Sequence, residues 1–290
     1  MKLGLGTVQF GLDYGISNKD GQSSLEEAKQ VVQAFSKAGA KVIDTSVLYG
    51  NSEEVLGQVL HDALPLKICS KISADTDSHG SVAGQIKQSL AHLKQTSIHA
   101  YLVHQSKPLF GPQGTSRYRE LQAAKEAGLC NKIGYSVYDP DELAWLVQRY
   151  PPDIVQLPLN WFDMRFAQQG WLQKLADKGV EIHSRSLFLQ GLLLMPITEL
   201  PSFTRPFLQH LQAYHQAAER AGMSLLEAAL CMSTKVDEIS AFVLGCPNLQ
   251  QAQQILEAYA RVLQQPMDFS AFACEAGELI DPRLWPKTQA

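Results

Sequence analysis

Hydrophobic and polar positions along this chain follow two alternating periods, one typical of strands and the other typical of helices. Short apolar runs, several of them ending in a polar residue, predict strands at residues 3–7, 41–44, 66–71, 98–103, 132–136, 154–157, 181–184 and 241–244. Between them, apolar residues recur at helical spacing. The pattern therefore predicts eight strands separated by helices.

The expected helices carry recognisable ends. Ser24 to Glu27 and Ser224 to Glu227 both have the capping-box pattern, and Asp139 is followed by proline at the first helical position. Glycines close several helical stretches. The best-defined helices are predicted at residues 53–60, 81–93, 117–127, 170–178 and 249–263, besides those opened by the caps.

Eight strands alternating with helices indicate an α/β protein with the (β/α)8 or TIM-barrel architecture, a parallel eight-stranded barrel inside a ring of helices. A doubly wound sheet is the alternative, but no G-x-G-x-x-G sequence follows the first strand. No stretch has the composition of a linker, so residues 1–290 are expected to form one domain.

Composition and net charge limit the partners and the cellular compartment that we expect. The net charge is −4, which gives no reason to expect nucleic acid or an acidic membrane as a partner. The five cysteines are scattered without a C-x-x-C pair, as expected for reduced thiols in the cytoplasm. We find neither a signal-peptide pattern nor an apolar run of membrane-spanning length. We expect a cytoplasmic protein that is monomeric, because no heptad pattern is present.

In a barrel of this type, catalytic side chains lie at the carboxyl ends of the strands. Asp44 ends the second predicted strand, Lys71 ends the third, and His104 directly follows the fourth. Tyr49 lies in the loop after the second strand. Each residue alone has an ordinary structural explanation as a turn former, ion pair or packing group, but together they are predicted to meet at one rim of the barrel.

The four residue types suit acid–base chemistry. A tyrosine is a weak acid with an ordinary pKa of about 10, and a neighbouring cation favours its phenolate. Lys71 is placed to be that cation, and Asp44 on the adjacent strand is placed to pair with it. His104 could donate a hydrogen bond to a substrate carbonyl. We interpret the group as a candidate proton-transfer site with no metal.

Residues 43–53 read I-D-T-S-V-L-Y-G-N-S-E and resemble the I-D-T-A-x-x-Y-G-x-S-E signature of the aldo-keto reductases. Ser46 replaces the usual alanine, which we interpret as a harmless exchange of small residues. The resemblance implies NAD(P)H-dependent reduction of an aldehyde or ketone. It implies Tyr49 as the general acid, Lys71 and Asp44 as the groups that tune it, and His104 as the group that orients the carbonyl.

The resemblance continues through the later strands. Residues 133–137 are similar to the family's I-G-V-S-N segment, with Val137 in place of asparagine, and residues 184–193 are similar to its A-Y-S-P-L-x-x-G-L-L region. Arg185 stands where many members carry an aromatic residue that stacks on the nicotinamide, and its planar guanidinium could stack there too. The implied cofactor-binding residues are Thr7, Ser136, Gln156, Ser184, Arg185, Ser186, Gln190, Gly245, Gln251 and Gln254.

The nucleotide form of the cofactor is less clearly implied. Gly245 and Gln251 stand where members that prefer NADPH usually carry a lysine and an arginine. A helix amino terminus near Asn248 could still receive a phosphate through its backbone N–H groups. Family habit favours NADPH, and NADH remains open.

The substrate is expected to be a small carbonyl compound of undefined identity. Loops at residues 105–116 and 195–202 are predicted to wall the pocket, with candidate apolar lining from Tyr14, Leu48, Trp161 and Phe162, although each could equally belong to the core. Two other functions stay open. One is a redox-sensing regulatory subunit that resembles the potassium-channel β subunits. The other is an isomerase or aldolase in which Lys71 forms a Schiff base.

Overall fold

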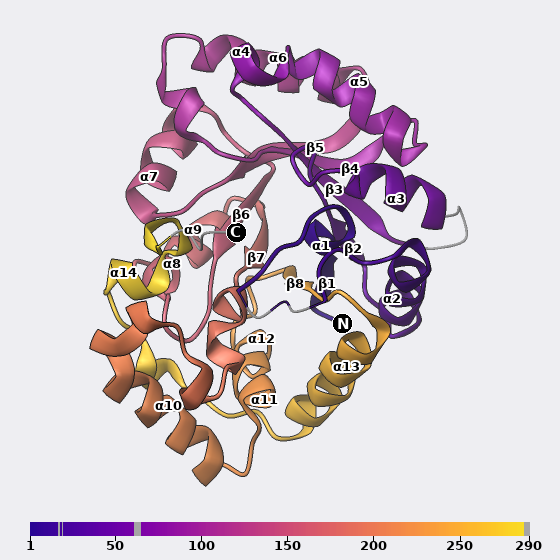
Figure 1. The fold of residues 1–290 in the computed structure, drawn as a ribbon. Helices are drawn as coiled ribbons and strands as arrows, with labels where there is room; N and C mark the ends of the chain where they lie inside the picture. Colours follow the sequence, from indigo (N-terminus) through magenta and orange to yellow (C-terminus); the bar gives the residue numbers. More distant parts are fainter. Residues whose placement is uncertain (17, 19, 61–64, 287–290) are drawn as a thin grey trace.

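The protein folds as a closed barrel of parallel strands inside a ring of helices (Figure 1), as predicted. The computed structural model describes residues 1–16, 18, 20–60 and 65–286. Each strand pairs with the next in sequence, and β8 returns to β1, where Leu3 is the partner of Phe242 and Gly6 that of Gly245. The strands are β1 (Leu3–Gly6), β2 (Val42–Asp44), β3 (Lys67–Ile72), β4 (Ile98–Val103), β5 (Cys130–Ser136), β6 (Ile154–Pro158), β7 (Glu181–Arg185) and β8 (Ala241–Gly245).

The larger helices follow the strands along the chain and lie on the outside of the barrel (Figure 1). They are α2 (Leu25–Lys37), α3 (Ser52–Val59), α5 (Val82–Leu93), α6 (Gly114–Glu126), α7 (Pro140–Arg149), α9 (Trp171–Ala176), α10 (Leu208–Arg220), α11 (Leu225–Leu230) and α13 (Leu249–Gln264). Single-turn helices add α1 (Val8–Gly11), α4 (Thr76–His79), α8 (Arg165–Gln168), α12 (Met232–Lys235) and α14 (Gly277–Ile280). Short 3-10 segments occupy Lys107–Phe110, Leu189–Leu194, Ile197–Glu199, Ser202–Phe207, Ser270–Phe272 and Pro282–Leu284. Within the described residues, no helix is long and apolar enough to cross a membrane.

Capping residues in the sequence correctly predicted where several helices begin. The two capping boxes form at the starts of α2 and α11, and the Asp139 side chain accepts a hydrogen bond from the Glu142 N–H at the start of α7. Helix α6 begins three residues before its predicted start, at Gly114, and α9 is shorter than predicted. The single-turn helices were not predicted, because one turn is too short to show a periodic pattern.

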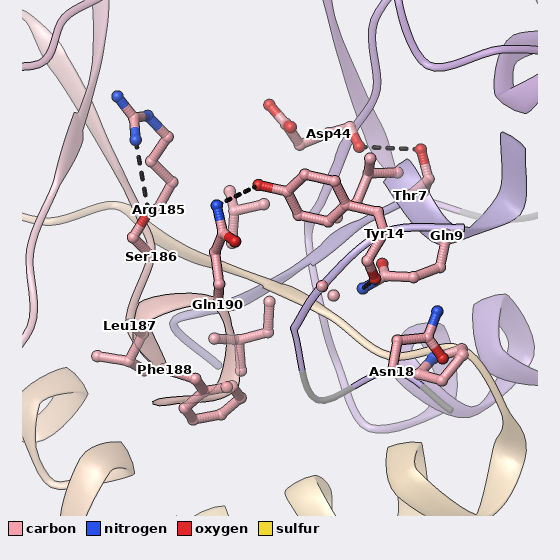
Figure 2. A pocket seen from close by; sticks show the side chains of 18 of the residues that line it. Thr7, Gln9, Tyr14, Asn18, Asp44, Arg185, Ser186, Leu187, Phe188 and Gln190 are labelled. Atoms are coloured by element: carbon pink, nitrogen blue, oxygen red, sulfur yellow. Dashed lines mark hydrogen bonds between the residues drawn. The ribbon is translucent and has the colours of Figure 1, made fainter. Parts of the chain in front are cut away.

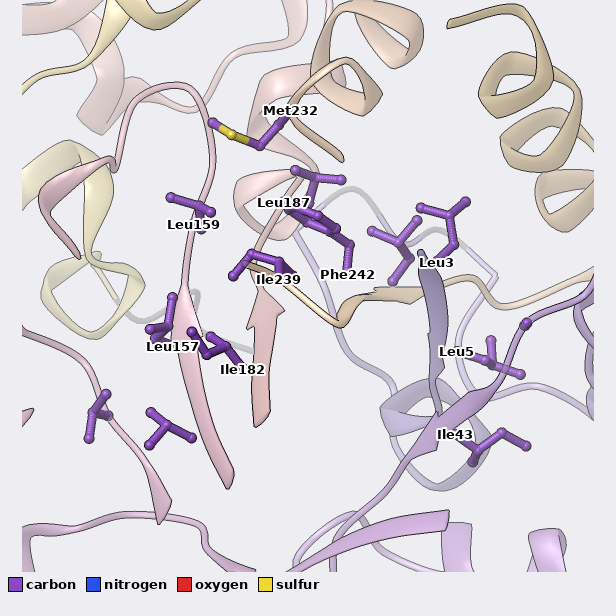
Figure 3. Close-up of a cluster of buried hydrophobic side chains, with 14 of the residues drawn as sticks. Leu3, Leu5, Ile43, Leu157, Leu159, Ile182, Leu187, Met232, Ile239 and Phe242 are labelled. Carbon is purple, nitrogen blue, oxygen red and sulfur yellow. The ribbon is translucent and has the colours of Figure 1, made fainter. Parts of the chain in front are cut away.

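Alternation along the strands separates the barrel interior from the layer under the helices. Small and apolar side chains that point inward form a cluster of their own, made of Val42, Cys69, Ala100, Leu102, Ile154 and Ala241. The neighbouring positions point outward and pack against the helices. Figure 3 shows part of that outer layer, including Leu5, Ile43, Ile182 and Phe242. Asp44, Lys71 and Gln156 share the inward register of the first cluster, so the strand period brings them to the barrel axis.

Candidate active site

A cavity of about 620 Å³ opens at the carboxyl ends of the strands. That volume is in the range of small-molecule sites. Its walls come from the ends of β1, β2, β5, β6, β7 and β8, from the segments that follow β1, β2, β4, β5 and β7, and from α13. Figure 2 shows side chains from segments far apart in the sequence, among them Tyr14, Asp44, Arg185 and Gln190, gathered around this space. The cavity lies at the rim where the strand ends were predicted to converge.

Asp44, Lys71 and Tyr49 form a continuous chain of polar contacts. The Lys71 ammonium lies 2.5 Å from Asp44 Oδ2 and donates to the Thr45 carbonyl at 2.9 Å. It also lies 3.4 Å from the Tyr49 hydroxyl. Lys71 is 1% exposed and does not line the cavity, whereas Asp44 and Tyr49 do. The lysine therefore reaches the cavity only through its two partners.

Burial and charge act on these groups in opposite directions. Burial lowers the pKa of Lys71, but Asp44 and then Tyr49 outweigh it, and the net effect raises that pKa. Burial raises the pKa of Tyr49, and Lys71 only partly offsets this effect. The phenol is therefore protonated at neutral pH. Lys71 favours the phenolate, as expected, but the cost of burying a negative charge is larger.

Two glycines let the Tyr49 loop pack directly against the loop after β1. A Cβ on Gly11 would lie 1.8 Å from the Tyr49 carbonyl oxygen, and one on Gly50 would lie 2.2 Å from the Gly11 carbonyl oxygen. Gly50 also has a positive φ of 55°, which strains other residues. This close approach fixes the backbone that carries the phenol.

His104 completes the group, and a serine holds its ring. Its backbone N–H donates to the Ile72 carbonyl at 2.9 Å, and its Nδ1 lies 2.9 Å from Ser46 Oγ. The imidazole stands edge-on to the Tyr49 ring, with centroids 5.3 Å apart. Burial, followed by the charges of Lys71 and Arg185, lowers the pKa of His104 to about 3. The ring is therefore neutral at physiological pH.

The neutral histidine makes folding stability depend on pH. In the unfolded chain it gains a proton below its ordinary value of 6.5, whereas in the folded protein it stays neutral to about pH 3. The free energy of unfolding should therefore fall as the pH drops through 6.5. Between about pH 8 and about pH 5, wild type should lose about 2 kcal/mol more than the His104→Gln variant. Urea unfolding at both pH values measures this difference, and parallel losses would contradict it.

The opposite wall carries the groups predicted to hold a nicotinamide. Gln156 donates from its amide nitrogen to Asp44 Oδ1 at 2.7 Å, and Ser136 Oγ accepts from Arg185 Nε at 3.3 Å. The Arg185 guanidinium also donates to the Val137 carbonyl at 2.9 Å and stacks on the Tyr138 ring, 4.0 Å from its centroid. Arg185 lines the cavity, but one face of its plane is already covered by Tyr138.

At the far end of the cavity, Gly245 leaves a space that Gln9 fills. A Cβ at Gly245 would lie 2.6 Å from Gln9 Oε1, which has no hydrogen-bond partner among the described residues. The Gln9 amide nitrogen makes one long hydrogen bond, to the Tyr14 carbonyl at 3.4 Å. Beside it, Asn248 caps α13 and donates to Asp20 at 2.9 Å. A carboxylate thus lies next to the amino terminus of α13.

Most of the predicted site residues line the cavity. They are Thr7, Tyr14, Asp44, Leu48, Tyr49, His104, Ser136, Gln156, Arg185, Ser186, Gln190, Gly245, Gln251 and Gln254. Tyr14 and Gln190 meet over the cavity, where the Gln190 amide donates to the Tyr14 hydroxyl at 3.1 Å (Figure 2).

Besides Lys71, three predicted residues do not line the cavity. Trp161 is buried and donates to the Ala228 carbonyl at 2.7 Å, and Phe162 packs edge-on against Tyr214. Both belong to the core, which was the alternative to the pocket lining, because their rings fill the space between the barrel wall and the outer helices. Ser184 is also buried outside the cavity, since it has the outward register of Ile182 on β7.

The loop predictions need correction as well. Among the described residues, the cavity lining includes no member of the 105–116 loop, and residues 195–202 line an adjoining hollow that shares Gly191, Leu194 and Gln251 with the cavity. The loops after β1 and β7 wall the cavity instead. Residues that sequence reasoning missed are Gln9, Asn18, Ser46 and Tyr138. Ser46 could have been found from its departure from the family signature, whereas no distinctive sequence pattern marks the other three residues.

Comparisons with known proteins agree with this fold. Among solved structures, the holo form of aldo-keto reductase AKR11C1 from Bacillus halodurans has a TM-score of 0.73 at 17% identity, covering 93% of this chain and 90% of that one. The glycerol dehydrogenase AKR11B4 from Gluconobacter oxydans has a TM-score of 0.63 at 19% identity, covering 92% and 94%. These similarities show the same barrel fold.

Sequence similarity extends to the family level. An aldo-keto reductase from Mycobacterium avium is 26% identical over 255 residues, which cover 84% of this chain and 86% of that protein. The aldo/keto reductase family model matches residues 2–271. The chain therefore belongs to the aldo/keto reductase family, whose members are oxidoreductases that generally use NAD(P)H.

Proposed function

We propose that this protein reduces a small aldehyde or ketone to the corresponding alcohol, with Tyr49 as the proton donor. The observation that supports this most strongly is the contact chain from Asp44 through Lys71 to Tyr49, which ends at the cavity beside His104. A neutral, protonated phenol and a neutral imidazole on one wall are the groups that a carbonyl oxygen needs as it gains negative charge.

The residues around the cavity fit a nicotinamide dinucleotide. Gln156 lines the cavity, and no donor from the described part of the chain reaches its amide oxygen. That oxygen could accept from a carboxamide, with Ser136 beside it. At the other end, Gln9 is held by one long hydrogen bond and could turn toward a ligand at little cost. When bound, the reduced nicotinamide supplies a hydride to the carbonyl carbon.

The protein's own groups handle the proton. Tyr49 gives its hydroxyl proton to the substrate oxygen, and the Lys71 ammonium beside it stabilises the phenolate that remains. Asp44 keeps Lys71 charged and aimed at the phenol. His104 donates a hydrogen bond to the same substrate oxygen and so fixes its position. Lys71 does not suit Schiff-base chemistry, because it is 1% exposed and already paired.

Charge around the nucleotide end supports a cofactor site with little preference for NADPH. Arg185 is the one lysine or arginine among the described residues that line the cavity, and it belongs to the nicotinamide end. Near α13, the residues that face the cavity are neutral, and Asp20 lies beside the helix amino terminus. A phosphate there would gain backbone N–H groups but would meet a carboxylate.

Wild type should therefore bind NADH within about tenfold of NADPH, measured as quenching of its four tryptophans. Gln251→Arg, which adds a cation at the cavity, should tighten NADPH binding about tenfold and leave NADH binding unchanged. Gln253→Arg adds the same charge at an exposed position of α13 outside the cavity and serves as the control. Wild type that binds NADPH alone would contradict this part of the proposal, and binding of neither nucleotide would contradict the reductase function itself.

A further inference from the structure

Ser46 stands where the family signature usually has alanine, and its hydroxyl contacts His104. Its side chain is fully buried, two residues after the end of β2. Ser46 Oγ lies 2.9 Å from His104 Nδ1, accepts a hydrogen bond from the Leu48 N–H at 3.1 Å, and lies 3.2 Å from the Lys71 carbonyl oxygen. An alanine could make none of these contacts.

The serine has one hydroxyl hydrogen and two possible acceptors for it. One is the Lys71 carbonyl, which already accepts from the Val47 N–H at 3.0 Å. The other is Nδ1 of His104, which is closer and has no other protein donor among the described residues. Donation to Nδ1 uses the shorter contact, and the Lys71 carbonyl keeps its hydrogen bond from the Val47 N–H.

The choice between these acceptors decides which nitrogen of the neutral ring carries its proton. If the hydroxyl donates to Nδ1, the proton lies on Nε2. If the hydroxyl donates to Lys71, Nδ1 must carry the proton, and Nε2 becomes an acceptor. No protein group in the described part of the chain bonds Nε2, and His104 lines the cavity, so this atom is left for a ligand.

We propose that Ser46 is a positioning residue whose hydroxyl donates to Nδ1 of His104, so that the ring presents an Nε2–H donor to the substrate carbonyl oxygen. This inference rests on the proposed carbonyl reduction. It differs from the interpretation of Ser46 as a harmless exchange. The serine holds the imidazole in one tautomer and one orientation before substrate arrives, which lowers the cost of ordering the ring in the transition state.

Nitrogen-15 NMR of histidine-labelled protein reads the tautomer directly, with the His104 signals identified by their loss in His104→Gln. Wild type should show the proton on Nε2. Ser46→Ala should show a mixture of both tautomers, with kcat lowered about five- to tenfold and the Kd of the nicotinamide cofactor unchanged. Ser46→Cys, which keeps the volume but is a weaker donor, should fall between them.

Ser233→Ala is the matched control, because Ser233 is also a buried serine, and its hydroxyl donates to the Leu230 carbonyl away from the cavity. The His104 signals and the kcat of the Ser233→Ala variant should match those of wild type. The proposal would be overturned if the proton lay on Nδ1 in wild type. It would also be overturned if Ser46→Ala kept both the Nε2–H tautomer and the wild-type kcat. If no carbonyl compound is reduced while the tautomer still depends on Ser46, the proposed function fails and the control of the ring by Ser46 is supported.

Discussion

Replacing Tyr49 by phenylalanine should lower kcat for carbonyl reduction by about two to four orders of magnitude, the usual range for removing a general acid. The ring keeps its place against His104, but no group on that wall can then give a proton to the substrate oxygen. The Kd for the nicotinamide cofactor should change little. Steady-state rates at saturating cofactor, together with fluorescence titration, separate the two effects.

Tyr101→Phe is the control for removing a buried phenolic hydroxyl. Tyr101 is fully buried on β4, its hydroxyl donates to Ser89 at 3.0 Å, and it does not line the cavity. This variant should lose about 1 kcal/mol of stability and keep its kcat. If Tyr49→Phe turned over like Tyr101→Phe, the proton donor would have to be another group.

Replacing Lys71 by methionine should damage both stability and catalysis. The ion pair with Asp44 is almost completely buried, with side chains 1% and 4% exposed. Removing one partner leaves a buried charge uncompensated, so the free energy of unfolding of the variant should be about 3–5 kcal/mol lower. Its kcat should also fall by at least about tenfold, because the phenolate left after proton transfer loses its neighbouring cation.

A second substitution separates the two effects. The double variant Asp44→Asn/Lys71→Met contains no buried charge at this site and should recover most of the lost stability, but not the activity. Lys125→Met is the matched control, since Lys125 pairs with Asp153 at 2.7 Å where both side chains are partly exposed, and should cost about 1 kcal/mol or less. Equal losses from Lys71→Met and Lys125→Met would contradict the account.

Much of this site could be predicted because it depends on strand periodicity. Asp44 and Lys71 lie at the ends of short apolar strands, and the period of two together with the parallel register brings them to one rim. The capping boxes likewise depend only on residues three apart in the sequence. These features need no knowledge of distant packing, and the fold confirmed them.

The features that could not be predicted depend on contacts between segments far apart in the chain. Trp161 and Phe162 follow a strand end as pocket residues do, and only the positions of Ala228 and Tyr214 show that they are core. The stacking of Arg185 on Tyr138 depends in the same way on the loop after β5. Ser46 looked neutral because its contact with His104 joins residues 58 positions apart.

The most direct test of the central claim follows deuterium from the reactive carbon of the reduced nicotinamide into the product. With wild type and a panel of small aldehydes and ketones, mass spectrometry should find the label on the carbinol carbon of the alcohol. Tyr49→Phe, measured over the same time with the cofactor bound, should form little of this labelled alcohol. Failure of wild type to transfer the label to any carbonyl compound, or equal transfer by Tyr49→Phe, would contradict the assignment of this cavity as a carbonyl-reducing site.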